Sequence, residues 1–112
     1  MRYCMIFSSL KKNEDFRTVY NRGKSFANRQ LVFYYMPNKL SENRVGFSIS
    51  KKFGKAVYRN KARRRLKEIL RASSCKKQGY DMIFIVRPGA KEADYATLEK
   101  SVTHLFQKTE MI

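Results

Sequence analysis

The side chains best suited to chemistry are concentrated in a basic stretch, YRNKARRRLKEILR, over residues 58–71. At about 100° per residue, one side of a helix over this stretch is apolar. That side carries Ala62, Leu66, Ile69 and Leu70. The opposite side carries the cations Lys61, Arg63, Arg64, Arg65, Lys67 and Arg71, and Glu68 is the only acid in the stretch. The pattern predicts a helix with one core face and one strongly positive face.

Two interpretations of the positive face can be weighed on charge. A solvated helix steadied by ion pairs four residues apart would need acids, and one Glu cannot pair with so many cations. Like charges at this spacing, such as Arg63 with Lys67, cost about 0.2–0.5 kcal/mol each. Phosphates would offset that cost, and Arg forks hold phosphate oxygens bidentately. We therefore predict an anion-binding face. Asn60 is either a recognition amide or the N-cap of this helix, and both interpretations stay open.

The charge of the whole chain supports a polyanionic partner. The 112 residues include 25 Lys and Arg against nine Asp and Glu, a formal charge of +16. Such an excess destabilises a compact state by self-repulsion unless a polyanion binds it. Nucleic acid is the first candidate and an anionic membrane surface the second. No apolar run approaches the ~20 residues of a spanning helix, and the first ten residues lack the features of a signal peptide. The sequence predicts a cytoplasmic nucleic-acid-binding protein.

The length fits one compact domain over 1–112, with residues 1–9 as a loose N-terminal segment. Apolar periodicity predicts helices and strands in the order αββαβα, an α+β class with helices packed on one small mixed sheet. The expected elements are helices over 13–22, 58–73 and 94–108, and strands over 31–36, 44–50 and 80–86. The first two strands are expected to pair as an antiparallel hairpin. An additional short strand near 25–27 is an open alternative. The unit over 44–86 would normally cross over right-handed.

A second candidate site is aromatic. Its members are Phe16 and Tyr20 on one face of the first helix and Val32 and Tyr34 on one face of the first strand. One small sheet cannot deeply bury aromatic residues on both of its faces. An open aromatic face beside the basic loop at Lys51 and Lys52 is typical of proteins that hold single-stranded nucleic acid. For Phe16, Tyr20 and Tyr34, a place in the core and a place in a cleft are both compatible with the pattern.

The sequence offers no catalytic or metal-binding constellation. His104 is isolated, no pair of acids is placed to hold two metal ions, and no Gly-rich phosphate loop occurs. Cys4 and Cys75 lack the further ligands of a zinc site, so we expect reduced thiols. We predict a binding protein with no catalytic residues and no protein-bound metal.

Several motifs, in order along nearly the whole chain, carry a family resemblance. They are KKNEDF at 11–16, SFANRQ at 25–30, RVGFSISKK at 44–52 and, most specifically, Arg59-Asn60-x-x-Arg63-Arg64-x-x-Lys67-Glu68. With these motifs the chain closely resembles the protein subunit of bacterial ribonuclease P.

The resemblance implies a fold, an activity and partners. It implies a left-handed crossover through the basic helix, against the general rule. It implies a protein cofactor of a ribozyme that removes the 5′ leader of precursor tRNA, with Mg²⁺ bound mainly by the RNA, and no catalysis by the protein alone. The partners would be the catalytic RNA and the leader, with no membrane and no obligate protein partner. The implied catalytic-RNA contacts are Arg59, Asn60, Lys61, Arg63, Arg64 and Lys67. The implied leader cleft is Phe16, Tyr20, Val32, Tyr34, Lys51 and Lys52. The alternative is a structural RNA-binding protein of the ribosomal type without a leader cleft.

Overall fold

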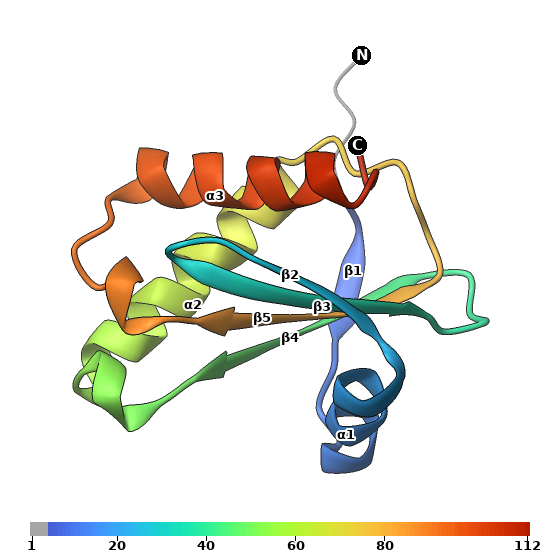
Figure 1. Ribbon diagram of the computed structural model, residues 1–112, viewed down its shortest axis with the longest axis horizontal. Helices are drawn as coiled ribbons and strands as arrows, with labels where there is room; N and C mark the ends of the chain where they lie inside the picture. Colours follow the sequence, from blue (N-terminus) through green and yellow to red (C-terminus); the bar gives the residue numbers. More distant parts are fainter. Residues whose placement is uncertain (1–4) are drawn as a thin grey trace.

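Residues 5–112 are described by the computed structural model, and they form a three-layer α+β domain (Figure 1). The strands are β1 (Phe7–Ser9), β2 (Lys24–Ala27), β3 (Leu31–Pro37), β4 (Asn43–Ile49) and β5 (Tyr80–Val86). The helices are α1 (Asn13–Arg22), α2 (Ala56–Arg71) and α3 (Tyr95–Lys108), with short 3-10 turns η1 (Lys51–Phe53) and η2 (Pro88–Ala90). The predicted α+β class and element order are confirmed, and the open alternative of a strand near 25–27 is realised as β2.

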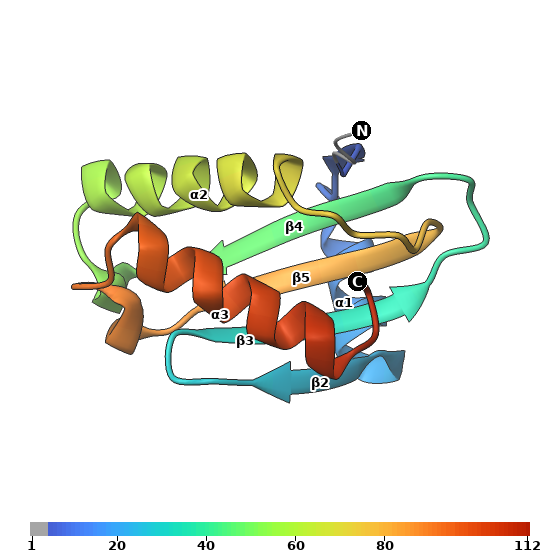
Figure 2. The same ribbon diagram turned by 90° about the horizontal axis from the view of Figure 1, so that it is seen from above.

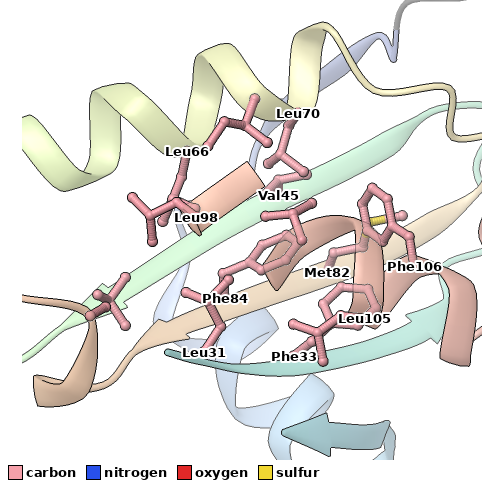
Figure 3. Close-up of a cluster of buried hydrophobic side chains, with 14 of the residues drawn as sticks. Leu31, Phe33, Val45, Leu66, Leu70, Met82, Phe84, Leu98, Leu105 and Phe106 are labelled. Atoms are coloured by element: carbon pink, nitrogen blue, oxygen red, sulfur yellow. The ribbon is translucent and has the colours of Figure 1, made fainter. Parts of the chain in front are cut away.

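The main core lies between the sheet and the two longer helices. Helices α2 and α3 cover one face of the sheet, and α1 lies against the other (Figures 1 and 2). Figure 3 shows the apolar stripe of α2 (Leu66, Leu70) and that of α3 (Leu98, Leu105, Phe106) meeting strand residues such as Phe33 and Phe84. The Phe33 and Phe84 rings stack with centroids 4.8 Å apart. Each fully buried side chain of this size contributes about 1.5–3 kcal/mol, so this core fixes where α2 sits on the sheet.

The predicted hairpin between the first two long strands is wrong. The sheet order is β1-β4-β5-β3-β2, so β5 lies between β3 and β4. Strand β5 runs antiparallel to β3 and parallel to β4, with Phe84 opposite both Phe33 and Phe47. Met82, Ile83 and Phe84 are consecutive and fully buried, which requires a strand covered on both faces. Burying this most apolar strand in the centre outweighs the local pairing of two strands joined by a short loop.

The crossover from β4 through α2 to β5 is left-handed. In Figure 2, α2 lies on the viewer's side of the sheet, both strands point to the left, and β5 lies below β4. With the strands turned to point upwards and the helix in front, β5 lies to the left of β4. The resemblance therefore gave the correct hand, and the general right-handed rule does not hold for this unit.

The N-terminal segment is more ordered than expected. Phe7–Ser9 forms β1 and pairs in parallel with the start of β4, and the backbone N–H of Leu10 donates to the Val45 carbonyl at 2.9 Å. The expectation of a loose segment over 1–9 therefore does not hold for residues 7–9. Three residues are too few to give a strand signal in the sequence. Residues 1–4, which include Cys4, lie outside the described part of the chain.

Candidate nucleic-acid interface

The basic face of α2 is built on one side of a single rigid helix. At about 100° per residue, Arg59, Asn60, Arg63, Arg64 and Lys67 fall within one sector of the helix surface. An Nη1–H of Arg63 donates to Oδ1 of Asn60 at 2.9 Å, which fixes this guanidinium beside the amide. The helix begins at Ala56 after Lys55, so the N-cap interpretation of Asn60 is wrong. Asn60 lies in the second turn, on the same surface as the cations.

Lys61 does not join that surface. It lies about 160° around the helix from Arg63. There it lines, together with Arg65, a separate hollow of about 330 Å³ between α2 and the η2–α3 segment. The structure therefore brings five of the six predicted catalytic-RNA contacts together and places the sixth on another side of α2.

The aromatic residues form the rim of a second, smaller core under α1. The centre of this core is Leu10, Val19 and Ile83, which are buried. Phe16, Tyr20 and Tyr34 pack around it and stay partly exposed. The Tyr20 ring lies edge-on to that of Tyr34 with centroids 5.0 Å apart, and 6.3 Å from that of Phe16. Each of these three residues is thus partly buried and partly accessible, which combines the two alternatives that the sequence left open.

The Tyr20 phenol is kept in its neutral form. Burial raises the pKa of Tyr20 above 10.0, an effect opposed in part by a hydrogen bond with the Ser48 side chain and assisted by Tyr34. A neutral phenol can donate a hydrogen bond and presents no charge to a phosphate chain.

Helix α1 covers only one end of its sheet face (Figure 1). Across the sheet, Gly46, Ile83 and Tyr34 form one row beneath α1. The next row contains Ser48, Ile85, Val32 and Ala27, from β4 to β2. These four side chains are half-buried or exposed, and among residues 5–112 the backbone of no helix lies over them, although the Tyr20 side chain of α1 reaches the row at Ser48. We call this row the open row; at about 4.8 Å between strands it is roughly 14 Å long.

Lys51 and Lys52 lie at the β4 end of the open row. Both are exposed in η1, which follows β4 after a single residue. They therefore place positive charge beside a flat strip that is otherwise uncharged. The predicted cleft residues come from α1, β3 and η1: the aromatic residues lie under and beside α1, and Lys51 and Lys52 follow the opposite end of β4, with the open row between the two groups.

A hollow of about 210 Å³ connects the basic helix with the aromatic cluster. It is lined on one side by Arg63 and Lys67 and on the other by Phe16 and Lys11, with Gly46 between them. Strand β1 pairs with β4 only as far as Val45, so the edge of β4 is uncovered from Gly46 onwards. The α2 cations and the α1 aromatic residues are therefore two walls around the same strand edge, although they belong to opposite layers of the domain.

Sequence reasoning missed Arg44, which holds these layers in register. Its Nε donates to Oδ1 of Asp81 at 2.8 Å and its Nη2 to Oδ2 at 2.6 Å, while Nη1 lies 3.4 Å from Oδ2 of Asp15. The hydrogen bonds to Asp81 raise the pKa of Arg44 above its ordinary value. The network joins β4, β5 and the first turn of α1. No sequence signal could have shown it, because Arg44 and Asp81 are 37 positions apart.

Other kinds of site find little support in residues 5–112. No three His, Cys, Asp or Glu side chains there gather closely enough to hold a metal ion. None of the helices in this part of the chain has the length and apolar character needed to cross a membrane. Cys75 is a half-buried free thiol, and burial raises its pKa.

Known proteins resemble this chain in both sequence and structure. The Ribonuclease P family profile matches residues 7–110. The ribonuclease P protein component of Caldanaerobacter subterraneus subsp. tengcongensis is 48% identical over 103 residues, covering 91% of this chain and 89% of its own. That of Clostridioides difficile is 47% identical over 104 residues, with 91% of each chain covered. Among solved structures, the Staphylococcus aureus RNase P protein matches with a TM-score of 0.86 at 36% identity, covering 92% of this chain and 95% of that one. The Thermotoga maritima protein matches with a TM-score of 0.82 at 28% identity, covering 90% and 96%.

Proposed function

Because this chain belongs to the ribonuclease P protein family, the protein cofactor of the ribozyme in tRNA 5′ maturation, we propose that its two candidate surfaces bind different RNAs. The basic face of α2 binds the catalytic RNA. The open row and its aromatic border bind the 5′ leader of precursor tRNA. The observation that carries this proposal is the hollow at the β4 edge, which has Arg63 and Lys67 on one wall and Phe16 on the other. A leader bound beside α1 would there meet the RNA bound along α2.

The α2 surface has the chemistry of a phosphate-binding face. Guanidinium groups bind phosphate oxygens through two hydrogen bonds at once, and a rigid helix presents them at fixed spacing. The Arg63–Asn60 hydrogen bond orients one fork before RNA arrives, which reduces the entropy lost on binding. The contacts are Arg59, Asn60, Arg63, Arg64 and Lys67, and Lys61 reaches RNA only at the margin of this surface.

The leader site suits single-stranded RNA. Val32 and Ile85 offer a flat apolar floor, and the accessible sides of Phe16, Tyr20 and Tyr34 border it. Bases stack on such surfaces with little dependence on sequence, while exposed lysines attract the phosphates. Lys51 and Lys52 supply that charge at the β4 end of the row. A site of this kind accepts leaders of many sequences, as a general tRNA-processing factor requires.

We place the Mg²⁺ ions of the holoenzyme mainly on the RNA subunit. The one buried acid among residues 5–112, Asp81, is already paired with Arg44, as is the half-buried Asp15, and the exposed Asp94 caps α3. The protein therefore contributes binding and positioning, and the RNA carries out the cleavage. We place this processing in the cytoplasm.

The test is single-turnover cleavage of precursor tRNA by the protein assembled with bacterial ribonuclease P RNA at low Mg²⁺. We expect the protein to accelerate a substrate with a long leader much more than one with a single-nucleotide leader. The variant Lys51→Ala/Lys52→Ala should lose most of this difference, whereas Lys91→Ala/Lys100→Ala, which removes the same charge elsewhere, should keep it. Equal acceleration of both substrates would instead support the structural RNA-binding alternative without a leader cleft. Robust cleavage by the protein and Mg²⁺ without RNA would contradict the assignment of chemistry to the RNA.

A further inference from the structure

A second surface with basic and aromatic residues lies at the β2 edge of the sheet. It is on the face that α2 and α3 cover, opposite the open row. Two adjoining hollows, of about 370 and 200 Å³, share Lys24, Tyr35 and Tyr80 as lining residues. The larger hollow is also lined by Phe26, Lys77 and Lys108. We call these six residues the β2 surface. None of them belongs to the leader site or to the basic face of α2.

The β2 surface combines unpaired positive charge with accessible rings. The Tyr35 and Tyr80 rings lie 6.3 Å apart, Lys77 Nζ lies 5.9 Å from the Tyr80 ring centroid, and Phe26 is 42% exposed. Among residues 5–112 the only ion pairs within 4.0 Å are those of Arg44 with Asp15 and Asp81, so no cation of this surface is neutralised by a neighbour. Glu110 is the single acid that lines the hollows.

Charge alone would not single out this surface, because a chain of +16 carries cations on every face. The accessible aromatic residues distinguish it. A hollow with rings and lysines matches single-stranded RNA, whose bases stack and whose phosphates are attracted. Duplex RNA keeps its bases stacked inside the helix and offers nothing to the rings.

The open row leads directly to this surface. Its last residue, Ala27, is on β2, which is the outermost strand, has four residues, and is exposed throughout. Side chains alternate along a strand, so Ser25 and Ala27 face the open row while Lys24 and Phe26 face the other side. An RNA strand that leaves the open row over β2 therefore meets Phe26 first, beside Ala27, and reaches Lys24 at the other end of the same strand, where Arg22 at the end of α1 flanks the edge. Figure 2 shows β2 as the free border of the sheet below α3.

We propose that the β2 surface binds the upstream nucleotides of the same leader, after they pass around the β2 edge. The inference rests on the proposed leader site and extends it. The leader would lie along one face of the sheet in the open row, bend at the short strand β2, and stack on Phe26 and the accessible parts of Tyr35 and Tyr80. Lysines at both ends of the hollow would hold its phosphates.

The experiment measures the affinity of the reconstituted holoenzyme for precursor tRNAs whose leaders are lengthened stepwise. The wild-type protein should show an early gain when the leader fills the open row and a second gain when it becomes long enough to pass β2. Lys24→Ala/Lys108→Ala and, separately, Phe26→Ala should keep the early gain and lose the second, which we expect to be about tenfold. The salt dependence with long leaders should flatten by roughly 1.4 for the double variant, at ~0.7 per phosphate contact. The control Lys91→Ala/Lys100→Ala should behave as wild type at every length.

Each other outcome has a definite meaning. If both variants retain the second gain, or if the wild type has none, the β2 surface does not bind the leader. If they weaken binding equally at all leader lengths, the surface contacts another part of the RNA complex, or another partner, and the proposal is overturned. If the early gain itself is absent or insensitive to Lys51→Ala/Lys52→Ala, the leader site is wrong and both proposals fall. Thermal melting of each variant establishes that the changes leave the fold intact.

Discussion

The ring of Phe16 lies directly on the backbone of Gly46. A methyl group at position 46 would come within 2.4 Å of Cζ and 2.8 Å of Cε1 of that ring. This contact sets how closely α1 approaches β4, and hence the geometry of the hollow between Phe16 and the α2 cations. A glycine is needed there for space, since any side chain on this face of β4 would occupy the position of the ring.

Gly46→Ala should therefore destabilise the domain and disturb the leader site. Overpacking of this kind costs about 1–3 kcal/mol, because the ring and α1 must move away from the sheet. We expect a lower denaturation midpoint and a reduced preference for long-leader substrates, with the α2 contact to RNA largely kept. Urea unfolding and the leader comparison measure the two effects.

The matched control for this prediction is a double-mutant cycle with Phe16→Ala. If the clash with the ring is the cause, Gly46→Ala should be nearly neutral in the Phe16→Ala background. An equal cost in both backgrounds would show that the effect comes from the strand itself rather than from the ring.

Replacing Arg63 and Arg64 with Ala should change the salt dependence of binding to ribonuclease P RNA. Each lost phosphate contact reduces the slope of log affinity against log salt by ~0.7–0.9, so the double variant should lose about one to two units. Filter binding across a salt series gives the slope. Lys91→Ala/Lys100→Ala removes the same formal charge from another surface and should leave the slope unchanged. A slope unchanged by Arg63→Ala/Arg64→Ala would place the RNA contact elsewhere.

Asp81→Ala should be strongly destabilising. The carboxylate is buried and receives two hydrogen bonds from Arg44 and one from Asn38 at 2.9 Å. Removing it leaves a half-buried guanidinium without its main partner, at a cost of about 2–4 kcal/mol. Asp15→Asn removes only the longer, more exposed ion pair and should cost at most about 0.5 kcal/mol. Equilibrium unfolding of both variants tests the order; similar losses would contradict the primary role of Asp81.

The N-cap of α3 should give a small acid-dependent contribution to stability. The Thr97 backbone N–H donates to Oδ1 of Asp94 at 2.8 Å, and this hydrogen bond holds the pKa of Asp94 below 3.8. A carboxyl whose pKa is lower in the folded state stabilises the fold above its unfolded pKa and loses that contribution as the pH falls through the folded value. The melting temperature of wild type relative to Asp94→Asn should therefore decline in the acid range and be constant near neutral pH. A difference that does not change with pH would show that charge adds nothing to this cap.

The positions of the long helices and strands were predicted closely from the local pattern of apolar residues. The observed bounds of α1, Asn13–Arg22, and of β5, Tyr80–Val86, equal the predicted ranges, and those of α3 differ by one residue at its start. Apolar spacing is a local property, so a single sequence carries it well. The beginning of α2 was predicted two residues late because Ala56 and Val57 precede the strongly patterned part, and Val57 stays exposed.

By itself the sequence determined that this chain is one basic α+β domain with a helix that is apolar on one face and strongly positive on the other. The motif around Arg59-Asn60 indicated the family, because its residue types and their spacing along one helix can be read directly from the sequence. Only the tertiary structure decided that β5 separates β3 from β4, that Arg44 pairs with Asp81, and that Lys61 lies apart from the other predicted RNA contacts. It alone placed Phe16 and Arg63 around one strand edge. These relationships join residues far apart along the chain, and they arise from how the layers share one buried core, which no local pattern records.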